Sequence, residues 1–374
     1  MEEMTMKKHI SFIAVLLGTL VLLDGCNKTG LPGKGDLITF GTVSEGTRTK
    51  AAYGDDFTVG SDKYQAIDWE AGDIVRIISP EAEVSGDGSG LHWADYTVTE
   101  VNKQTDGTSA AVVNTNPNGL TWTDADSYSF YGVYPSTTPI SLEEATYAQV
   151  SADFIPAEPA LSATTDTKTV GDITYTVYTP DLSNAVMTAV ATGVKESDEK
   201  PQVKLHFKPT WTAIEFNLSS LDEPAEITQI QLVADSENDD YLAGPFTMTA
   251  GDLSTAAFTT SSLSKTVTLA TTSGTDGVTV TTTEGATFTM MLLPKANVKS
   301  LKFRVTSKEG DETKTSVVTL SFKNGDPLVL NAGEKYRING FKVPGNYWKI
   351  FYAPDILDAD KWGEPLGETN LIVE

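Results

Sequence analysis

The sequence is poor in the residues from which many functional sites are built. It contains one cysteine, Cys26, and three histidines among its 374 residues. One cysteine excludes a disulfide framework and a cysteine-rich zinc site. The chain also lacks the serine-hydrolase motif G-x-S-x-G, the zinc-protease motif H-E-x-x-H, a P-loop and a dinucleotide-binding fingerprint. We therefore expect neither an enzyme nor a bound cofactor.

Basic residues are also scarce. Lys and Arg total 27 and Asp and Glu total 51, so the formal net charge is −24. A surface this acidic repels phosphate, which excludes nucleic acid as a partner. Hydrophobic residues make up 40% of the chain, enough for a folded core. At about 150 residues per domain, the length predicts two domains.

Helix signals are few, and strand signals recur along the chain. Threonine, which is β-branched and favours strands, accounts for 51 residues. Apolar and polar residues alternate in segments such as Val203–Lys208, Leu301–Thr306 and Tyr336–Val343, so each strand has one buried and one wet face. The capping-box pattern at Ser141–Glu144 predicts one short helix. We expect an all-β protein built from antiparallel sandwiches.

The N-terminal residues have the pattern of an export signal. Lys7 and Lys8 precede the apolar run Ile10–Leu23, which is too short for a stable membrane-spanning helix. The last residue of the run begins the sequence Leu-Asp-Gly-Cys at Leu23–Cys26, which resembles the lipobox of bacterial lipoproteins. We expect residues 1–25 to be removed and Cys26 to carry lipid in the outer membrane. A simple signal peptide with an incidental cysteine is the alternative.

The mature chain divides most naturally at the charged, proline-ending segment Lys195–Pro201. This boundary predicts an N-terminal sandwich over residues 49–200 and a C-terminal sandwich over 201–343. Residues 344–374 form a C-terminal tail. The tail is too rich in large apolar residues to be solvated, so we expect it to pack against a protein surface.

Residues 26–48 form a leader that contains the first predicted strand, Leu37–Val43. Ile38 and Phe40 alternate there with polar or small residues and are predicted to face the core. We expect this strand to lie at a sheet edge.

A polar loop follows the first strand and contains Arg48. The chain has only three other arginines, Arg76, Arg304 and Arg337, and all three fall in strand-like segments. Exposed loops of small and polar residues are preferred sites of proteolysis. We expect an arginine-specific protease to cut between Arg48 and Thr49.

The residues offer two other kinds of candidate site. The aromatic residues Trp69, Trp93, Trp122 and Tyr128–Tyr134 are candidates for a sugar-binding platform, although aromatic residues in strands more often fill the core. The acidic run Asp235–Asp240 lacks the glycine and the final glutamate of an EF-hand loop, so we expect a solvated hairpin loop and no metal.

Catalytic chemistry has little support. Carboxylate pairs arise by chance in so acidic a chain, which makes a glycoside hydrolase the weakest reading. His206 is expected to face solvent between two lysines, and His92 to lie in a loop.

The motifs resemble the fimbrillin family of Bacteroidales lipoproteins, which supply subunits of surface fimbriae. Besides the lipobox, the matching segments in chain order are LITF at Leu37–Phe40, TRTKA at Thr47–Ala51, IDWEAGDIVRI at Ile67–Ile77, SFYGVYP at Ser129–Pro135, VKLHFKPTWTAIEF at Val203–Phe216, GPFTMTAGDL at Gly244–Leu253, FTMMLLP at Phe288–Pro294 and LNAGEKYRI at Leu330–Ile338. The resemblance implies two transthyretin-like sandwich domains in tandem. It also implies that a lipidated precursor loses its first strand to an arginine-specific protease. The groove then accepts a strand from another subunit.

The tail is the candidate donor. Leu371, Ile372 and Val373 are its most strand-like residues, and Tyr347–Tyr352 is a second option; alternatively the tail packs on its own domain. The leading hypothesis is a fimbrial subunit that supports adhesion to a host or bacterial surface ligand. The alternatives are a lipid-retaining fimbrial anchor and a surface glycan-binding lipoprotein.

Overall fold

The computed structural model describes the chain as a series of β-strands with the turns that connect them. The described residues are 35–44, 56–59, 62–65, 69, 71–85, 91–103, 109–114, 118–143, 147–154, 162–179, 185–195, 202–234, 241–258, 263–270, 277–293, 295–298, 300–322, 328–330, 332–343, 360–361 and 371–373. Every regular element among them is a strand, as the composition predicts. None of the described residues forms a helix long and apolar enough to cross a membrane.

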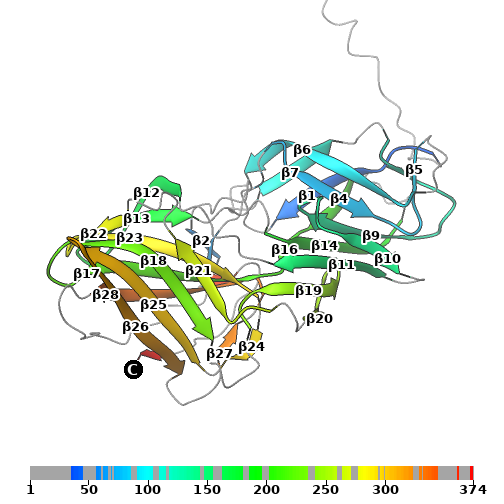
Figure 1. Ribbon diagram of the computed structural model, residues 1–374. Coiled ribbons are helices and arrows are strands. Elements are labelled where there is room, and N and C mark those ends of the chain that lie inside the picture. The colour runs from blue at the N-terminus through cyan, green and yellow to red at the C-terminus, as the bar shows by residue number, and fades with distance from the viewer. Residues whose placement is uncertain are drawn as a thin grey trace, which may run out of the picture.

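The first lobe is built on an eight-stranded sheet (Figure 1). In spatial order its strands are β15 (Gln202–His206), β1 (Thr39–Ser44), β7 (Ser109–Asn114), β6 (Trp93–Lys103), β4 (Ile74–Ile78), β9 (Tyr128–Tyr134), β14 (Met187–Val194) and β16 (Lys208–Pro209). Only Phe207 separates β15 from β16, so one short segment borders both ends of the sheet. The sheet therefore curls around its own core. A two-stranded sheet, β5 (Glu83–Val84) with β8 (Leu120–Thr121), completes the lobe.

The second lobe is a sandwich of two sheets. The larger sheet runs β12 (Ser162–Val170), β13 (Ile173–Thr179), β23 (Glu284–Leu292), β17 (Thr212–Ser220), β28 (Glu334–Val343), β29 (Asp360–Lys361), β3 (Asp62–Gln65) and β2 (Asp56–Val59). The smaller runs β21 (Thr266–Ala270), β18 (Ala225–Ala234), β25 (Ser300–Glu309), β26 (Glu312–Phe322) and β30 (Leu371–Val373), with β22 (Val278–Val280) also on β18.

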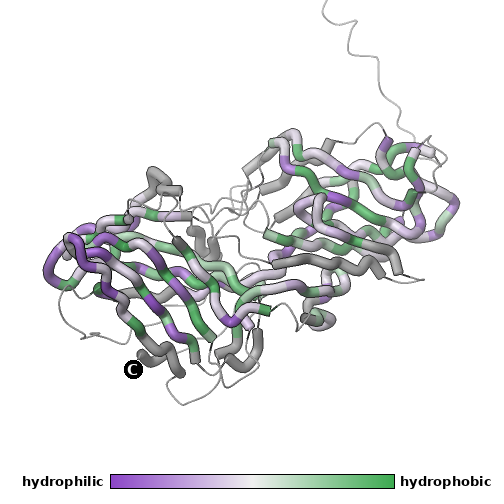
Figure 2. The backbone as a smooth tube through the Cα atoms, viewed as in Figure 1, coloured by the Kyte–Doolittle hydropathy of each residue, from purple (hydrophilic) through white to green (hydrophobic). Residues whose placement is uncertain are grey.

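The two sheets of the second lobe meet in an apolar core. Phe216 of β17 stacks on Phe303 of β25 with ring centroids 4.2 Å apart. Along β18 buried and partly exposed residues alternate on either side of a register shift between Ile227 and Gln229, and Figure 2 shows a matching alternation of hydropathy in this lobe. The prediction of all-β sandwich architecture is confirmed.

A four-stranded sheet joins the two halves of the chain. It pairs β10 (Ile140–Glu143) and β11 (Tyr147–Phe154) with β19 (Gly244–Thr249) and β20 (Asp252–Phe258), and Figure 1 shows β19 beside β11. A separate apolar cluster forms beside it, with Trp211 and Phe246 among its members. The last small sheet pairs β24 (Lys295–Val298) with β27 (Leu328–Leu330).

Strand pairing crosses the boundary expected near residue 200 in both directions. β15 and β16 follow that boundary but belong to the sheet of the first lobe. β12 and β13 precede it, yet β13 pairs in parallel with β23 of the second lobe. Sheet membership therefore does not follow chain order in this protein.

The short helix predicted after the capping box at Ser141–Glu144 is wrong, because β11 occupies Tyr147–Phe154. Ser141 and the two residues after it lie in β10, where Ile140 pairs with Val150 and Leu142 with Ala148. A capping box supplies only the first turn of a helix. The long ladder offered by β11 outweighs that local preference.

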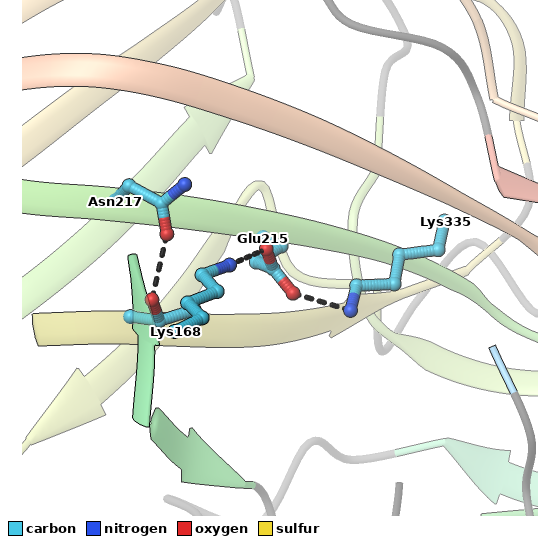
Figure 3. Close-up of polar contacts among 5 residues, drawn as sticks. Lys168, Glu215, Asn217 and Lys335 are labelled. Atoms are coloured by element: carbon cyan, nitrogen blue, oxygen red, sulfur yellow. Dashed lines mark hydrogen bonds and ion pairs between the residues drawn. The ribbon is translucent and has the colours of Figure 1, made fainter. Parts of the chain in front are cut away.

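A buried ion cluster lies on the second lobe's larger sheet. Glu215 of β17 pairs with Lys168 of β12 through one carboxylate oxygen and with Lys335 of β28 through the other (Figure 3). Glu215 and Lys335 are buried. Nearby, the Thr287 hydroxyl donates a hydrogen bond of 2.6 Å to the Asn217 side chain. The cluster links three strands of this sheet through one carboxylate.

Candidate functional site: the threaded segment and its surroundings

Residues 35–44, here called the threaded segment, run through the first lobe between other strands. In its second half, β1 pairs in parallel with β15 on one side and antiparallel with β7 on the other. The expectation of an edge strand is therefore wrong. The edge position belongs to β15, which the chain supplies from far along the sequence.

The first half of the threaded segment pairs with a different sheet. The Gly35 amide donates to the Trp122 carbonyl at 2.9 Å, and the Trp122 amide donates to the Asp36 carbonyl at 3.1 Å. The Ile38 amide donates to the Leu120 carbonyl at 2.8 Å. The segment therefore pairs first with β8 and then enters the eight-stranded sheet. Its backbone connects both sheets of the first lobe.

Two large side chains fix the threaded segment in the core. Ile38 and Phe40 are both 0% exposed, as their alternation predicts. The Phe40 ring meets Tyr96 and Phe130 edge-on, with centroid distances of 5.0 and 5.2 Å. Each buried large apolar side chain contributes about 1.5–3 kcal/mol. Phe40 is thus a central member of the core and not a peripheral contact.

Tyr96 connects this core to β8. Its hydroxyl accepts a hydrogen bond of 2.8 Å from the Leu120 amide, while the Leu120 carbonyl accepts from Ile38. Burial raises the pKa of Tyr96 well above its ordinary value, so the phenol stays neutral. Removal of the threaded segment would therefore disturb Leu120 and Tyr96 as well as the two strands beside β1.

The predicted processing residues lie beyond the end of β1. Ser44, its last residue, is four positions before Arg48. Cys26, Arg48 and Thr49 fall outside the described residues, as does the acidic run Asp235–Asp240. Among the residues that are described, no three His, Cys, Asp or Glu side chains gather closely enough to hold a metal ion.

The C-terminal strand pairs with its own chain in this structure. β30 adds antiparallel to the outer side of β26, with Leu371 opposite Phe322, Ile372 opposite Ser321 and Val373 opposite Leu320. This arrangement corresponds to the alternative in which the tail docks on its own domain. Tyr347–Tyr352 lies outside the described residues.

The aromatic residues do not form an exposed row. Trp69, Trp122 and Tyr131 are 2%, 4% and 5% exposed and fill the core. Trp93 is 37% exposed, and the Arg76 guanidinium lies 4.1 Å from its ring centroid. Arg76 also pairs with Asp95 at 2.7 Å. With most of the rings buried, a stacking platform for glycans has little support.

Sequence reasoning missed the strands that receive the threaded segment. The alternation predicts a strand over the segment that contains β15, and His206 is exposed on it as predicted. Its neighbour was not predicted, because alternation tells which face is buried but not which strand lies alongside. Nothing in the sequence indicates that Leu120 and Trp122 pair with the threaded segment.

Comparison with known proteins finds distant structural likeness only. No protein-family model matches the chain, and no curated protein sequence matches it. A candidate cell adhesion protein from Bacteroides uniformis is 16% identical, with 83% of this chain and 93% of that one covered and a TM-score of 0.46. One from Bacteroides ovatus is 17% identical, with 79% and 90% covered and a TM-score of 0.42.

A fimbrial assembly protein from Parabacteroides distasonis is 11% identical, with 82% of this chain and 92% of that one covered and a TM-score of 0.33. All three TM-scores are below 0.5, so a function has to be inferred from the chain's own strands.

Proposed function

We propose that the chain is a structural subunit of a surface fimbria, assembled by exchange of the threaded segment. The precursor is exported as a lipoprotein on Cys26 and reaches the outer surface of the cell. An arginine-specific protease cuts between Arg48 and Thr49. The leader leaves with its lipid, and a strand of another subunit takes its place.

The observation that carries this proposal is the position of β1. It is an interior strand with two neighbours, it buries Ile38 and Phe40 completely, and it ends four residues before Arg48. Loss of an interior strand leaves two rows of unpaired backbone groups and an apolar gap. A strand from a partner would satisfy both rows at once, which is a strong drive for association.

The gap defines what can fill it. A replacement must run parallel to β15 and antiparallel to β7, as β1 does. It must present two large apolar side chains two residues apart, matching Ile38 and Phe40. The six residues that replace β1 must be preceded by four residues that pair with the β8 region. A full replacement is therefore ten residues long.

The tail of a second subunit is the proposed donor. Leu371 and Val373 have the required spacing of two residues, but β30 is only three residues long against six for β1. Residues of the tail before Leu371 must therefore take part in the joint. Shaft, anchor and tip positions differ in whether the leader is lost and whether the tail is donated.

The test uses purified residues 27–374 and a trace of arginine-specific protease. Intact mass should show one cut, after Arg48, because Arg76, Arg304 and Arg337 lie in β4, β25 and β28. Size analysis should then show a growing ladder of oligomers. The matched control is Arg48→Lys, which keeps the positive charge but removes the cleavage site, and it should remain a monomer.

Two results would count against the proposal. Resistance to cleavage at Arg48 would mean that the leader stays on the subunit, which favours the lipid-retaining anchor. A clean cut followed by a stable monomer that retains the cut leader excludes strand exchange.

A further inference from the structure

β15 depends on the threaded segment for its place in the sheet. Among the described strands its one ladder partner is β1. Val203 and Leu205 face the core, while Lys204 and His206 are exposed. When the threaded segment leaves, β15 therefore loses its whole ladder while its apolar side chains remain in the core.

The gap left by the threaded segment could close without any partner. β15 is parallel to β1 and β7 is antiparallel to it, so β15 and β7 are antiparallel to each other. Phe40 pairs with Val203 on one side and with Val113 on the other. A shift of β15 by about 4.8 Å, one strand spacing, would bring Val203 opposite Val113 as antiparallel neighbours. That closed state would exclude an incoming strand.

Phe207, the residue directly after β15, resists this shift. Its ring is buried and meets Trp69 edge-on at a centroid distance of 5.2 Å. The ring also fills the space above Gly132 of β9, where an added Cβ would lie 2.6 Å from its Cζ atom. Gly132 is therefore the residue that admits the ring. Movement of β15 toward β7 would pull the Phe207 ring away from Trp69 and Gly132.

The chain after Phe207 is fastened on the side away from β7. β16 pairs with β14, with Lys208 opposite Thr188 and Pro209 opposite Met187. Thr210 then donates twice to the Val186 carbonyl, from its amide at 3.0 Å and from its hydroxyl at 2.8 Å. One end of β15 is thus fixed to β14, which β6, β4 and β9 separate from β7 in the sheet order.

We infer that Phe207, seated against Trp69 and Gly132, is a positioning residue that keeps the gap open after the threaded segment has left. The inference rests on the proposed function, because it assigns a role in strand exchange. Phe207 acts through β15: it holds one wall of the gap a strand's width from the other. The ligand is an extended peptide strand with large apolar residues two positions apart.

The experiment follows uptake of a labelled peptide of residues 35–48 by residues 27–374 after cleavage at Arg48. The test variant is Phe207→Leu. Phe216→Leu is the matched control, because it removes the same ring from the core of the other lobe. Thr210→Val is a second, milder variant that removes only the hydroxyl bond to Val186. Circular dichroism and urea unfolding of each uncut protein establish that it is folded.

We expect cut wild type and Phe216→Leu to take up the peptide equally. In Phe207→Leu, a closed state favoured tenfold would reduce the apparent affinity about tenfold. Hydrogen exchange should then show the amides of Lys204 and Val112 protected in the cut, peptide-free variant but not in wild type. Thr210→Val should show a smaller loss of uptake.

Two outcomes would overturn the inference, and a different one would overturn the proposed function. Uptake by folded Phe207→Leu at the wild-type level would exclude a role for Phe207 in holding the gap open. Protection of the Lys204 and Val112 amides in cut, peptide-free wild type would exclude it as well. Intact mass showing that cut wild type never releases its own leader, even with excess peptide, contradicts strand exchange itself.

Discussion

The first and last described strands are held in opposite ways. β1 lies inside a sheet with a neighbour on each side, and its preceding residues also pair with β8. β30 lies at the end of the six-stranded sheet, where three residues pair with β26 alone. Loss of an interior strand leaves a gap between two strands, whereas an edge strand can detach with little loss to its sheet. The proposed displaced strand and the proposed donor therefore differ in the way that exchange requires.

The largest effect expected is that of losing the threaded segment. Removing residues 35–44 after cleavage takes away two fully buried side chains and both ladders of β1. By analogy with large-to-small substitutions of one Phe and one Ile, the free energy of unfolding of the first lobe should fall by about 5–10 kcal/mol. Urea unfolding of the cut protein, read by hydrogen exchange in each lobe, measures this. An equal loss of stability in both lobes would show that the threaded segment does not stabilise the first lobe in particular.

Phe40→Ala should produce the largest effect of any single substitution considered. The ring is 0% exposed and packs against Tyr96 and Phe130, so its removal should lower the free energy of unfolding by about 3–5 kcal/mol. Thr39→Ala is the control, since Thr39 is exposed on the same strand, and it should change stability by less than about 0.5 kcal/mol. Urea unfolding of both variants measures this difference. Similar unfolding midpoints for the two variants would contradict a core role for Phe40.

Glu215→Gln tests whether the second lobe is stabilised independently. The substitution leaves the buried Lys335 beside a neutral amide, which should cost about 3 kcal/mol in the second lobe. Lys314→Met is the control, because its partner Glu312 is exposed and the pair is 3.7 Å apart. Such surface pairs contribute about 0–1 kcal/mol. Uptake of the threaded-segment peptide should be unchanged in both variants; a loss in Glu215→Gln would mean that the lobes are coupled.

Gly132→Ala should have a smaller effect, confined to the first lobe. The added methyl group would meet the Phe207 ring at a distance that forces it to move, at a cost of about 1–3 kcal/mol. In the double variant Gly132→Ala with Phe207→Leu, the smaller side chain should relieve part of this cost. Urea midpoints of the two single variants and the double variant give the coupling. Strict additivity would show that the ring and the glycine do not meet.

The sequence predicted faces well and neighbours poorly. The alternation at Ile38 and Phe40, and again at Val203 and Leu205, identified the side chains that enter the core. It could not reveal that β1 lies beside β15, because that pairing joins residues more than 150 positions apart and depends on the whole sheet. A period of two fixes which side of a strand is buried, and it is the same for an edge strand and an interior one with a single buried face.

Local patterns failed where a long-range ladder competed with them. The capping box at Ser141 was outweighed by the pairing of β10 with β11, and the charged segment before Pro201 did not prevent β15 from joining the first lobe. Gly132 shows a further limit of the sequence. Nothing in its local context indicates that a phenylalanine 75 positions later fills the space above it.

Deletion of residues 371–374 should have the smallest effect on stability and a decisive effect on assembly. β30 pairs on one side only, so its loss should change the free energy of unfolding by less than about 1 kcal/mol. Cleavage at Arg48 should still occur, but the truncated subunit would lack its donor and should form no ladder of its own. Mixed with cut full-length protein, it should accept a strand and end the chain. A truncated protein that still polymerises would transfer the donor role to an earlier part of the tail, such as Tyr347–Tyr352.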